Sequence, residues 1–166
     1  MKNFIYPFLL FVGLLSINMN SQSINNYNSF FIEYNENPFF KEYTTPFQTP
    51  PLDKIKLEHY LPAFEEGIKI KRAELDVIIN NQDKPTFENT IAAIEKSGKL
   101  LTKVSRVFFN ISGSNGDDET QKIAETITPE LSKLSNDIYL NEKLFQRIKL
   151  INDEKDKLNL TSEQMK

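Results

Sequence analysis

The sequence predicts an all-α fold. Four segments place apolar residues three, four or seven positions apart, which is the spacing that lines one side of a helix. No segment alternates apolar and polar residues with the period of two that a half-buried strand needs. Short polar joints separate the four segments, so successive helices should pack as antiparallel neighbours around one core.

The composition is that of one ordinary globular unit. The 166 residues are 39% hydrophobic and 26% charged, and the net charge of -3 is spread over interspersed lysines and acids. This pattern leaves no basic surface for a phosphate backbone, so we expect no nucleic-acid partner. We also expect the protein to be a monomer. The chain has no cysteine, which excludes disulfides, thiol chemistry and a lipid-modified cysteine.

Residues 1–23 have the order of a secretory signal peptide. Lys2 precedes an apolar run over residues 4–17, which is shorter than the roughly 20 residues of a membrane-spanning helix. Small residues follow, and we expect cleavage near Ser21 or Ser23. The mature protein would then be periplasmic or extracellular, with no stable membrane anchor. An uncleaved anchor is the alternative.

Residues 24–51 are predicted to form an extended N-terminal arm. The segment is rich in Asn, Tyr, Phe, Ser and Thr, it contains Pro38 and Pro46, and it has no sustained period. Its aromatic side chains favour docking on a neighbouring surface, and a mobile leader is the alternative. The aromatic residues that could dock are Phe39, Phe40, Tyr43 and Phe47.

The helical segment, residues 52–166, begins with a helix predicted over 58–80. Pro62 lies near its start, so either the first turn is distorted or regular helix begins near Leu61. The polar joint that follows, 80–85, is short enough to make the next helix an antiparallel neighbour. The apolar stripe of this first helix consists of Tyr60, Phe64, Ile68, Leu75, Ile78 and Ile79.

The next helix, predicted over 86–111, is the central strut. Thr86 is its expected N-cap, with Glu88 in the first turn, and Gly113, Asn115 and Gly116 are expected to end it. Its apolar stripe consists of Ile91, Ile94, Leu101, Val104, Phe108 and Ile111.

Two further helices follow. Asp117 should cap the third, which we expect to bend at Pro129 rather than break, because the apolar register continues across it. Asn141 should cap the fourth. The stripes are Ile123, Ile127, Leu131, Leu134 and Ile138 in the third helix, and Leu144, Phe145, Ile148 and Ile151 in the fourth.

A fifth helix start is predicted at the end of the chain. Thr161 and Gln164 have the spacing of a capping box. Few residues follow for such a helix to propagate into, so we expect this chain to be a truncated piece of a longer protein.

Few residues of this sequence are candidates for catalysis or metal binding. His59 is the single histidine and is expected to be a surface or capping residue. Without further histidines or cysteines the chain cannot assemble a zinc site, and a catalytic triad would have to use His59 itself. The adjacent acids Glu65 and Glu66, like Asp117 and Asp118, are expected to be solvated or capping, because neighbours on a helix point about 100° apart. Residues 110–118 are expected to form a small polar loop that either contacts a peptide or is an ordinary turn.

Several stretches of the sequence nevertheless resemble a known family. They match the N-terminal part of the bacterial peptidyl-dipeptidases called Dcp, which are grouped with oligopeptidase A among the thimet-oligopeptidase-like zinc metallopeptidases. The resemblance covers roughly residues 37–166. The stretches that carry it most clearly are 50–56 (PPLDKIK), 58–67 (EHYLPAFEEG) and 85–91 (PTFENTI), followed by 95–98, 107–110, 138–141 and 144–145.

The resemblance implies a secreted zinc metallopeptidase that removes dipeptides from the C-terminus of short, unstructured peptides. Members of the family are two-lobed and almost wholly helical, so this segment would be part of the N-terminal helical lobe and of the substrate-channel wall. In the family, zinc is held by a His-Glu-x-x-His helix and a further glutamate, none of which occurs here. We therefore assign no catalytic, cofactor-binding or metal-binding residue to this chain. We expect zinc only in the full-length parent protein, whose catalytic domain is absent here. This chain alone is expected to be inactive.

One position departs from the family pattern. Leu57 stands where the family often has a proline at the first helical position, which costs a little pre-organisation. The alternative to the whole interpretation is a free-standing secreted helical module that binds a partner without catalysis.

Overall fold

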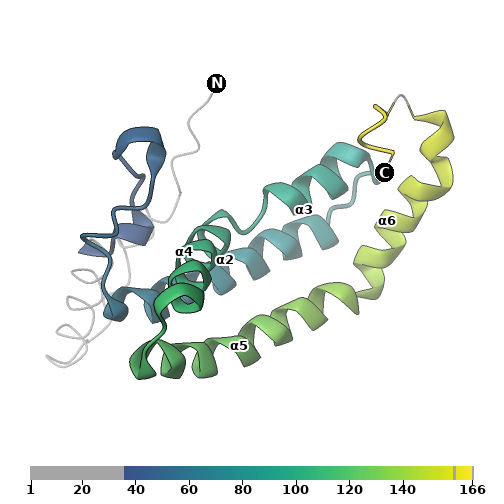
Figure 1. Ribbon diagram of the computed structural model, residues 1–166. Helices are drawn as coiled ribbons and strands as arrows, with labels where there is room; N and C mark the ends of the chain where they lie inside the picture. The colour runs from purple at the N-terminus through teal and green to yellow at the C-terminus, as the bar shows by residue number, and fades with distance from the viewer. Residues whose placement is uncertain (1–35, 159, 166) are drawn as a thin grey trace, which may run out of the picture. The chain divides into compact units, whose positions relative to one another are not determined.

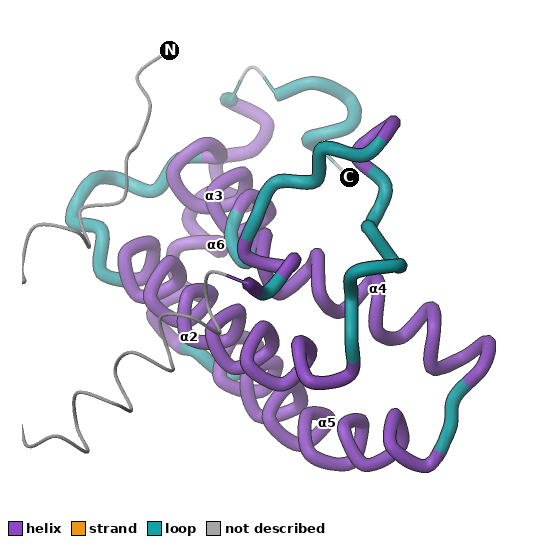
Figure 2. Tube along the Cα trace, turned by 90° about the vertical axis from the view of Figure 1, so that its left-hand side faces the viewer, coloured by secondary structure: helices purple, strands orange, loops and turns teal. Residues whose placement is uncertain are grey.

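The computed structural model describes residues 36–158 and 160–165. The predicted signal peptide, 1–23, and the first part of the predicted arm, 24–35, lie outside the described residues. Contacts divide the chain into two compact units, Met1–Glu36 and Asn37–Lys166, and the second is described here by itself. Its described residues form helices and loops and no strand, which confirms the all-α fold (Figures 1 and 2).

The described residues of this unit form the α-helices α2 (Tyr60–Ile79), α3 (Ala93–Lys96), α4 (Lys99–Asn115), α5 (Asp118–Tyr139) and α6 (Glu142–Glu154). Further helical turns lie before, between and after them: η2 (Pro38–Phe40), η3 (Pro46–Gln48), η4 (Leu57–His59), η5 (Phe87–Ala92), which is a π-helix, and η6 (Lys155–Lys157). No helix in the described ranges combines the length and the apolar content that crossing a membrane would take.

Helix α2 begins after one tight turn. The chain enters through the 3₁₀ turn η4 and becomes α-helical at Tyr60, so Pro62 lies in the first α-helical turn. A proline is tolerated there because the N–H groups of the first turn have no partner within the helix. The predicted stripe is confirmed at Tyr60, Phe64, Ile68, Leu75 and Ile78, which are all buried.

The central strut is not one helix, which corrects the prediction for 86–111. Thr86 does act as N-cap, since its hydroxyl accepts a hydrogen bond from the Asn89 N–H at 3.1 Å. The helix then breaks at Ser97 and Gly98, where Gly98 has φ +73°, a left-handed conformation that favours glycine. Helix α4 starts at Lys99 and runs through Gly113 to Asn115, so Gly113 does not end it.

Two side chains of α2 stabilise this break. The Lys71 ammonium donates to the Ser97 hydroxyl at 2.6 Å and to the Ile94 carbonyl oxygen at 3.3 Å, at the C-terminal end of α3. The Glu74 carboxylate accepts from the Gly98 N–H at 2.6 Å, at the N-terminal end of α4. A cation at a helix C-terminus and an anion at a helix N-terminus both match the helix dipole, so side chains of α2 stabilise both helix ends at the break.

Helices α2 and α4 are antiparallel and make the most extensive helix contact among the described residues, as predicted from the short joint. Three contacts show the direction: the Tyr60 ring lies 5.1 Å from Phe108, Gly67 faces Leu101, and Lys71 reaches Ser97. A Cβ on Gly67 would lie 3.0 Å from the Leu101 Cα, so glycine allows the two backbones to approach.

Helix α5 is continuous through Pro129 and completes the core. The Asp117 carboxylate caps it by accepting from the Thr120 N–H at 2.8 Å, as expected. Ile123, Ile127 and Leu134 are buried against the α2–α4 pair.

Helix α6 begins at its predicted cap but buries a different face. The Asn141 side-chain oxygen accepts from the Leu144 N–H at 2.9 Å. Phe145 and Ile148 were predicted to be buried, yet they are 54% and 37% exposed. The buried positions are Leu144, Arg147 and Ile151, because the helix is turned so that Arg147 lies inward.

Part of the predicted arm docks on the helices. Phe39 is buried with its ring 5.3 Å from that of Tyr60, and Phe40 packs against the same core. The Lys103 ammonium donates to the Phe39 carbonyl oxygen at 3.0 Å and lies 3.9 Å from the centre of the Tyr43 ring. Phe47 is 98% exposed, so it does not dock within this unit.

The capping box predicted near the end of the chain is present. The Thr161 N–H donates to the Gln164 side-chain oxygen at 2.9 Å, and the Gln164 N–H donates to the Thr161 hydroxyl at 3.3 Å. The two residues thus satisfy each other's backbone donors, as at a helix N-terminus.

Candidate functional site

The one histidine has a capping role. His59 lies in η4, and its Nδ1 accepts a hydrogen bond from the Lys56 N–H at 3.0 Å, which agrees with the structural role expected for it. Its backbone carbonyl oxygen accepts from the Asn37 side-chain amide at 2.9 Å. His59 therefore helps to hold the docked arm against the start of α2.

The adjacent acids are solvated or capping, as expected. Asp117 caps α5, and hydrogen bonds from Thr120 lower the pKa of its carboxyl group. Glu66 pairs with Lys69 at 3.1 Å on the surface of α2, while Glu65 and Asp118 are exposed.

Zinc does not fit the described part of the chain. A zinc site needs at least three ligands from Cys, His, Asp or Glu side chains close together. Among the residues that the structure describes, no group of three such side chains could hold a metal ion. No chemical step that uses a metal is therefore assigned to these helices.

The segment 110–118 is largely helical, which corrects the prediction of a polar loop. Helix α4 continues to Asn115 and α5 begins at Asp118, which leaves Gly116 and Asp117 as the turn. The Ser114 hydroxyl donates to the Asn110 carbonyl oxygen at 2.8 Å, one helical turn back. Such bonding is ordinary for serine in a helix and leaves the hydroxyl occupied.

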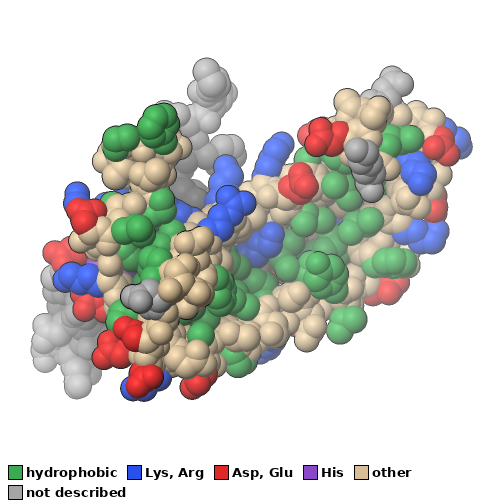
Figure 3. Space-filling view, in the orientation of Figure 1, with side chains coloured by type: hydrophobic (Ala, Val, Ile, Leu, Met, Phe, Trp, Pro, Cys, Tyr) green, Lys and Arg blue, Asp and Glu red, His purple; other side chains and the backbone are tan. Residues whose placement is uncertain are grey.

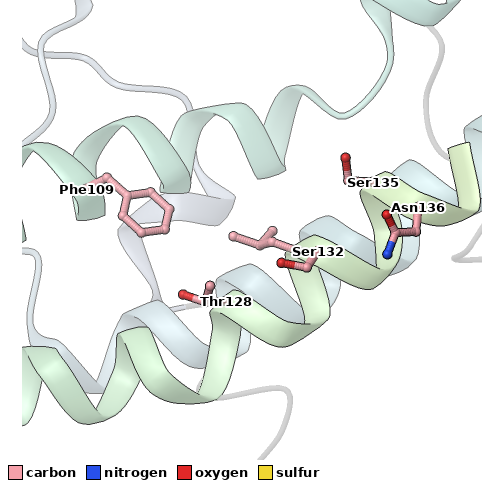
Figure 4. A pocket seen from close by; sticks show the side chains of 6 residues that line it. Phe109, Thr128, Ser132, Ser135 and Asn136 are labelled. Carbon is pink, nitrogen blue, oxygen red and sulfur yellow. The ribbon is translucent and has the colours of Figure 1, made fainter. Parts of the chain in front are cut away.

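Two concave surfaces remain as candidate contact sites. The first is a shallow cavity of about 430 Å³ between α4 and α5, shown in Figure 4. The Phe109 ring of α4 faces a row of small polar side chains on α5. An aromatic ring opposite hydroxyl and amide groups can contact both the side chains and the backbone of a peptide. The α5 residues that line this cavity are Thr128, Leu131, Ser132, Ser135 and Asn136.

The second surface is a groove of about 720 Å³ between the segment 42–50 and the start of α4. Figure 3 shows Lys and Arg side chains (blue) beside the hollow that separates the segment 42–50 from α3. We call this surface the cationic groove, after its lining residues Lys96, Lys99, Lys103 and Arg106.

Sequence reasoning missed both surfaces. The signal for the groove was available, because Lys99, Lys103 and Arg106 are spaced four and three residues apart and so share one face of a helix. The opposite wall was not predictable, because it depends on how the arm folds back. The cavity beside Phe109 had no distinctive pattern.

Comparison with known proteins identifies relatives. The chain is 44% identical over 130 residues to the dipeptidyl carboxypeptidase of Escherichia coli K12 and 42% identical over 130 residues to that of Salmonella typhimurium LT2. Each match covers 78% of this chain and 19% of the relative. Oligopeptidase A of E. coli K12 is 23% identical over 109 residues, which are 66% of this chain and 16% of that protein. No protein-family model matches the chain.

The chain thus spans about a fifth of the length of the curated relatives it matches. An identity of 42–44% over 130 residues is specific, and the weaker match to oligopeptidase A points to the same group of peptidases. The family resemblance seen in the sequence is confirmed: over the matched residues, this chain is a homologue of the dipeptidyl carboxypeptidases, the peptidyl-dipeptidases called Dcp.

Proposed function

We propose that this chain is a helical portion of an exported zinc peptidyl-dipeptidase that releases dipeptides from the C-terminus of short, unstructured peptides. The observation that carries the proposal is the 44% identity to the E. coli dipeptidyl carboxypeptidase over 130 residues. The all-α fold agrees with it. Export is inferred from the order of charged, apolar and small residues in 1–23.

Within such an enzyme, these helices would supply part of the substrate-channel wall. The described residues contain no group of side chains that could hold a metal ion, so their contribution would be to shape and binding. Zinc in the complete enzyme would supply a hydroxide near neutral pH by lowering the pKa of bound water. The cavity beside Phe109 has the mixed apolar and polar lining that suits contact with peptides of varied sequence.

Exposed apolar side chains support the idea that these helices pack against further protein. Tyr139 and Leu140, at the junction of α5 and α6, are each 82% exposed, and Phe145 at the start of α6 is 54% exposed. Single exposed apolar residues are common, but several large ones close together at a junction of two helices are typical of a surface that another part of a protein covers.

The proposal is tested by assaying the chain alone. We expect the purified chain to contain no stoichiometric zinc by elemental analysis and to release no dipeptide from a short peptide with a free C-terminus, with or without added zinc. The same peptide with an amidated C-terminus is the control for contaminating peptidases. Metal-dependent release of dipeptides by this chain alone would contradict the assignment of these helices to a non-catalytic wall.

A further inference from the structure

The cationic groove has an arrangement suited to extended ligands. Lys99, Lys103 and Arg106 follow one another along a single face of α4, and Lys96 precedes them at the end of α3. At 1.5 Å rise per residue, the distance along the helix from Lys99 to Arg106 is roughly 10 Å. An extended peptide advances about 3.3 Å per residue, so the groove matches about three residues of such a peptide.

The two walls of the groove are held together by Lys103. Its ammonium donates to the carbonyl oxygens of Phe39 and Lys41 and makes a cation–π contact with the Tyr43 ring. These contacts link α4 to the docked arm, which forms the other wall with Gln48 and Pro50. The concave shape therefore depends on packing within this unit.

The other cations of the groove are available to a ligand. Within the described part of the chain, the side chains of Lys96, Lys99 and Arg106 form neither an ion pair nor a hydrogen bond. Elsewhere on the unit Lys69, Lys84 and Lys149 each pair with a carboxylate, whereas Lys122 and Lys133 on α5 have no ion pair among the described residues. The distinction of the groove is that its cations gather in one concave surface. Unpaired cations gathered in a concave surface attract carboxylates, since low-dielectric walls strengthen the local field.

We propose that the cationic groove binds an acidic stretch of peptide through carboxylate side chains. The groove is also lined by the neutral hydrogen-bonding side chains of Gln48 and Thr102 and by the apolar side chain of Val107. Neutral donors and acceptors beside an apolar patch suit a peptide backbone and its side chains.

Two acids in the groove favour a peptide over a polyphosphate. Glu42 and Glu95 lie among the lining residues, so four cations face two carboxylates. This balance attracts a segment that carries one or two carboxylates at separate positions. A nucleic acid carries one charge per residue, and the two glutamates would repel it.

The proposal does not rest on the peptidase assignment, because it concerns binding by this chain and needs no catalysis. The probe is a fluorescently labelled short peptide with alternating glutamate and alanine, amidated at its C-terminus, whose binding to the purified chain is followed by fluorescence anisotropy at low salt. We expect saturable binding that weakens with added salt. The same peptide with glutamine in place of glutamate should bind at least about tenfold more weakly, as expected for two or more exposed ion pairs.

Matched variants assign the binding to the groove. The double variant Lys99→Gln/Arg106→Gln removes two exposed cations from α4 and should weaken binding about tenfold. Lys122→Gln/Lys133→Gln makes the same change in net charge at exposed positions of α5 and should leave binding within about twofold. Glu42→Gln removes a repelling charge from the groove and should strengthen binding.

Three results would overturn the proposal. Equal weakening by the two double variants would show that only net charge matters. Equal binding of the glutamine peptide would show that carboxylates are not recognised. The third result concerns a single-stranded oligonucleotide. If it binds as tightly as the acidic peptide, and if Lys99→Gln/Arg106→Gln weakens that binding, the groove selects for charge density and not for a peptide.

Discussion

Arg147 is a charged side chain buried without a carboxylate partner. It is 7% exposed, and it forms no ion pair with any described residue. Its guanidinium donates instead to neutral oxygens at the joint between α2 and η5: the Asn81 carbonyl at 2.7 Å, the Asn89 side chain at 3.1 Å and the Thr90 hydroxyl at 3.2 Å. A buried charge is tolerated only when hydrogen bonds replace its water, so Arg147 fixes α6 to this joint.

Arg147→Ala should lower the free energy of unfolding by about 2–4 kcal/mol, because it removes these hydrogen bonds and unties α6 from the joint between α2 and η5. Urea denaturation of the purified chain measures the change. Lys149→Ala is the control on the same helix, since Lys149 forms an exposed pair with Asp153 and should cost less than about 0.5 kcal/mol. Similar losses in the two variants would refute the structural role of Arg147.

Tyr43 should make the stability of the folded protein fall at alkaline pH. Burial raises the pKa of its hydroxyl from 10.0 to about 12, and that hydroxyl has no hydrogen-bond partner among the described residues. The folded state therefore keeps its proton more tightly than the unfolded state does. This contribution to stability is complete below pH 10 and is lost as pH rises towards 12.

Tyr43→Phe should remove part of this loss of stability at alkaline pH. Another part should remain, because burial also raises the pKa of the Tyr60 hydroxyl. Near neutral pH the variant should be as stable as the parent or slightly more so, because no hydrogen bond is lost and an unpartnered hydroxyl is removed. Urea denaturation at neutral pH and between pH 10 and 12 measures both effects. A large loss of stability at neutral pH would show that the Tyr43 hydroxyl has a partner.

At the scale of elements, the break in the strut shows what local sequence patterns can and cannot establish. The spacing of apolar residues continues from Ile94 to Leu101, so periodicity alone favours one helix. Gly98 was the only local sign of a break in the stretch from Ile94 to Leu101, because an isolated glycine weakens the prediction of a continuous helix. The break itself is stabilised from another helix, by Lys71 and Glu74 of α2, and no pattern within 86–111 contains that information.

The same limit explains the two other corrections. Helix α4 continues past Gly113, which keeps a helical backbone although a glycine near the end of an apolar stripe is a common stop signal. Helix α6 buries Arg147 because acceptors on the α2–η5 joint compensate its charge. Caps were predicted more reliably, at Thr86, Asp117 and Asn141, because a cap is formed by residues three positions apart.

Two glycine substitutions test the break directly. Gly98→Ala places a side chain on a backbone with φ +73° and brings its Cβ within 2.6 Å of the Lys71 side chain, so it should cost about 1–2 kcal/mol of stability. Gly113→Ala meets no atom within 4 Å and lies in regular helix, so it should stabilise by about 0.5–1 kcal/mol. Urea denaturation compares the two, and stabilisation by Gly98→Ala would contradict a left-handed residue between α3 and α4.

For the whole molecule, the family was predictable from the sequence but the candidate contact surfaces were not. Stretches such as 58–67 and 85–91 carried the resemblance, and relatives at 42–44% identity confirm it. The cationic groove combines α4 with the docked arm, and the cavity beside Phe109 combines α4 with α5. Both depend on packing between segments distant in sequence, which residue spacing within a single helix does not describe.

The central claim is that these helices serve as the non-catalytic part of a peptidyl-dipeptidase. The most direct measurement is dipeptide release by a chimera in which the matched 130 residues of the E. coli dipeptidyl carboxypeptidase are replaced by those of this chain. The account predicts that the chimera folds and releases dipeptides from the C-terminus of a short peptide. A folded chimera that releases no dipeptide, alongside an active parent enzyme, would contradict it.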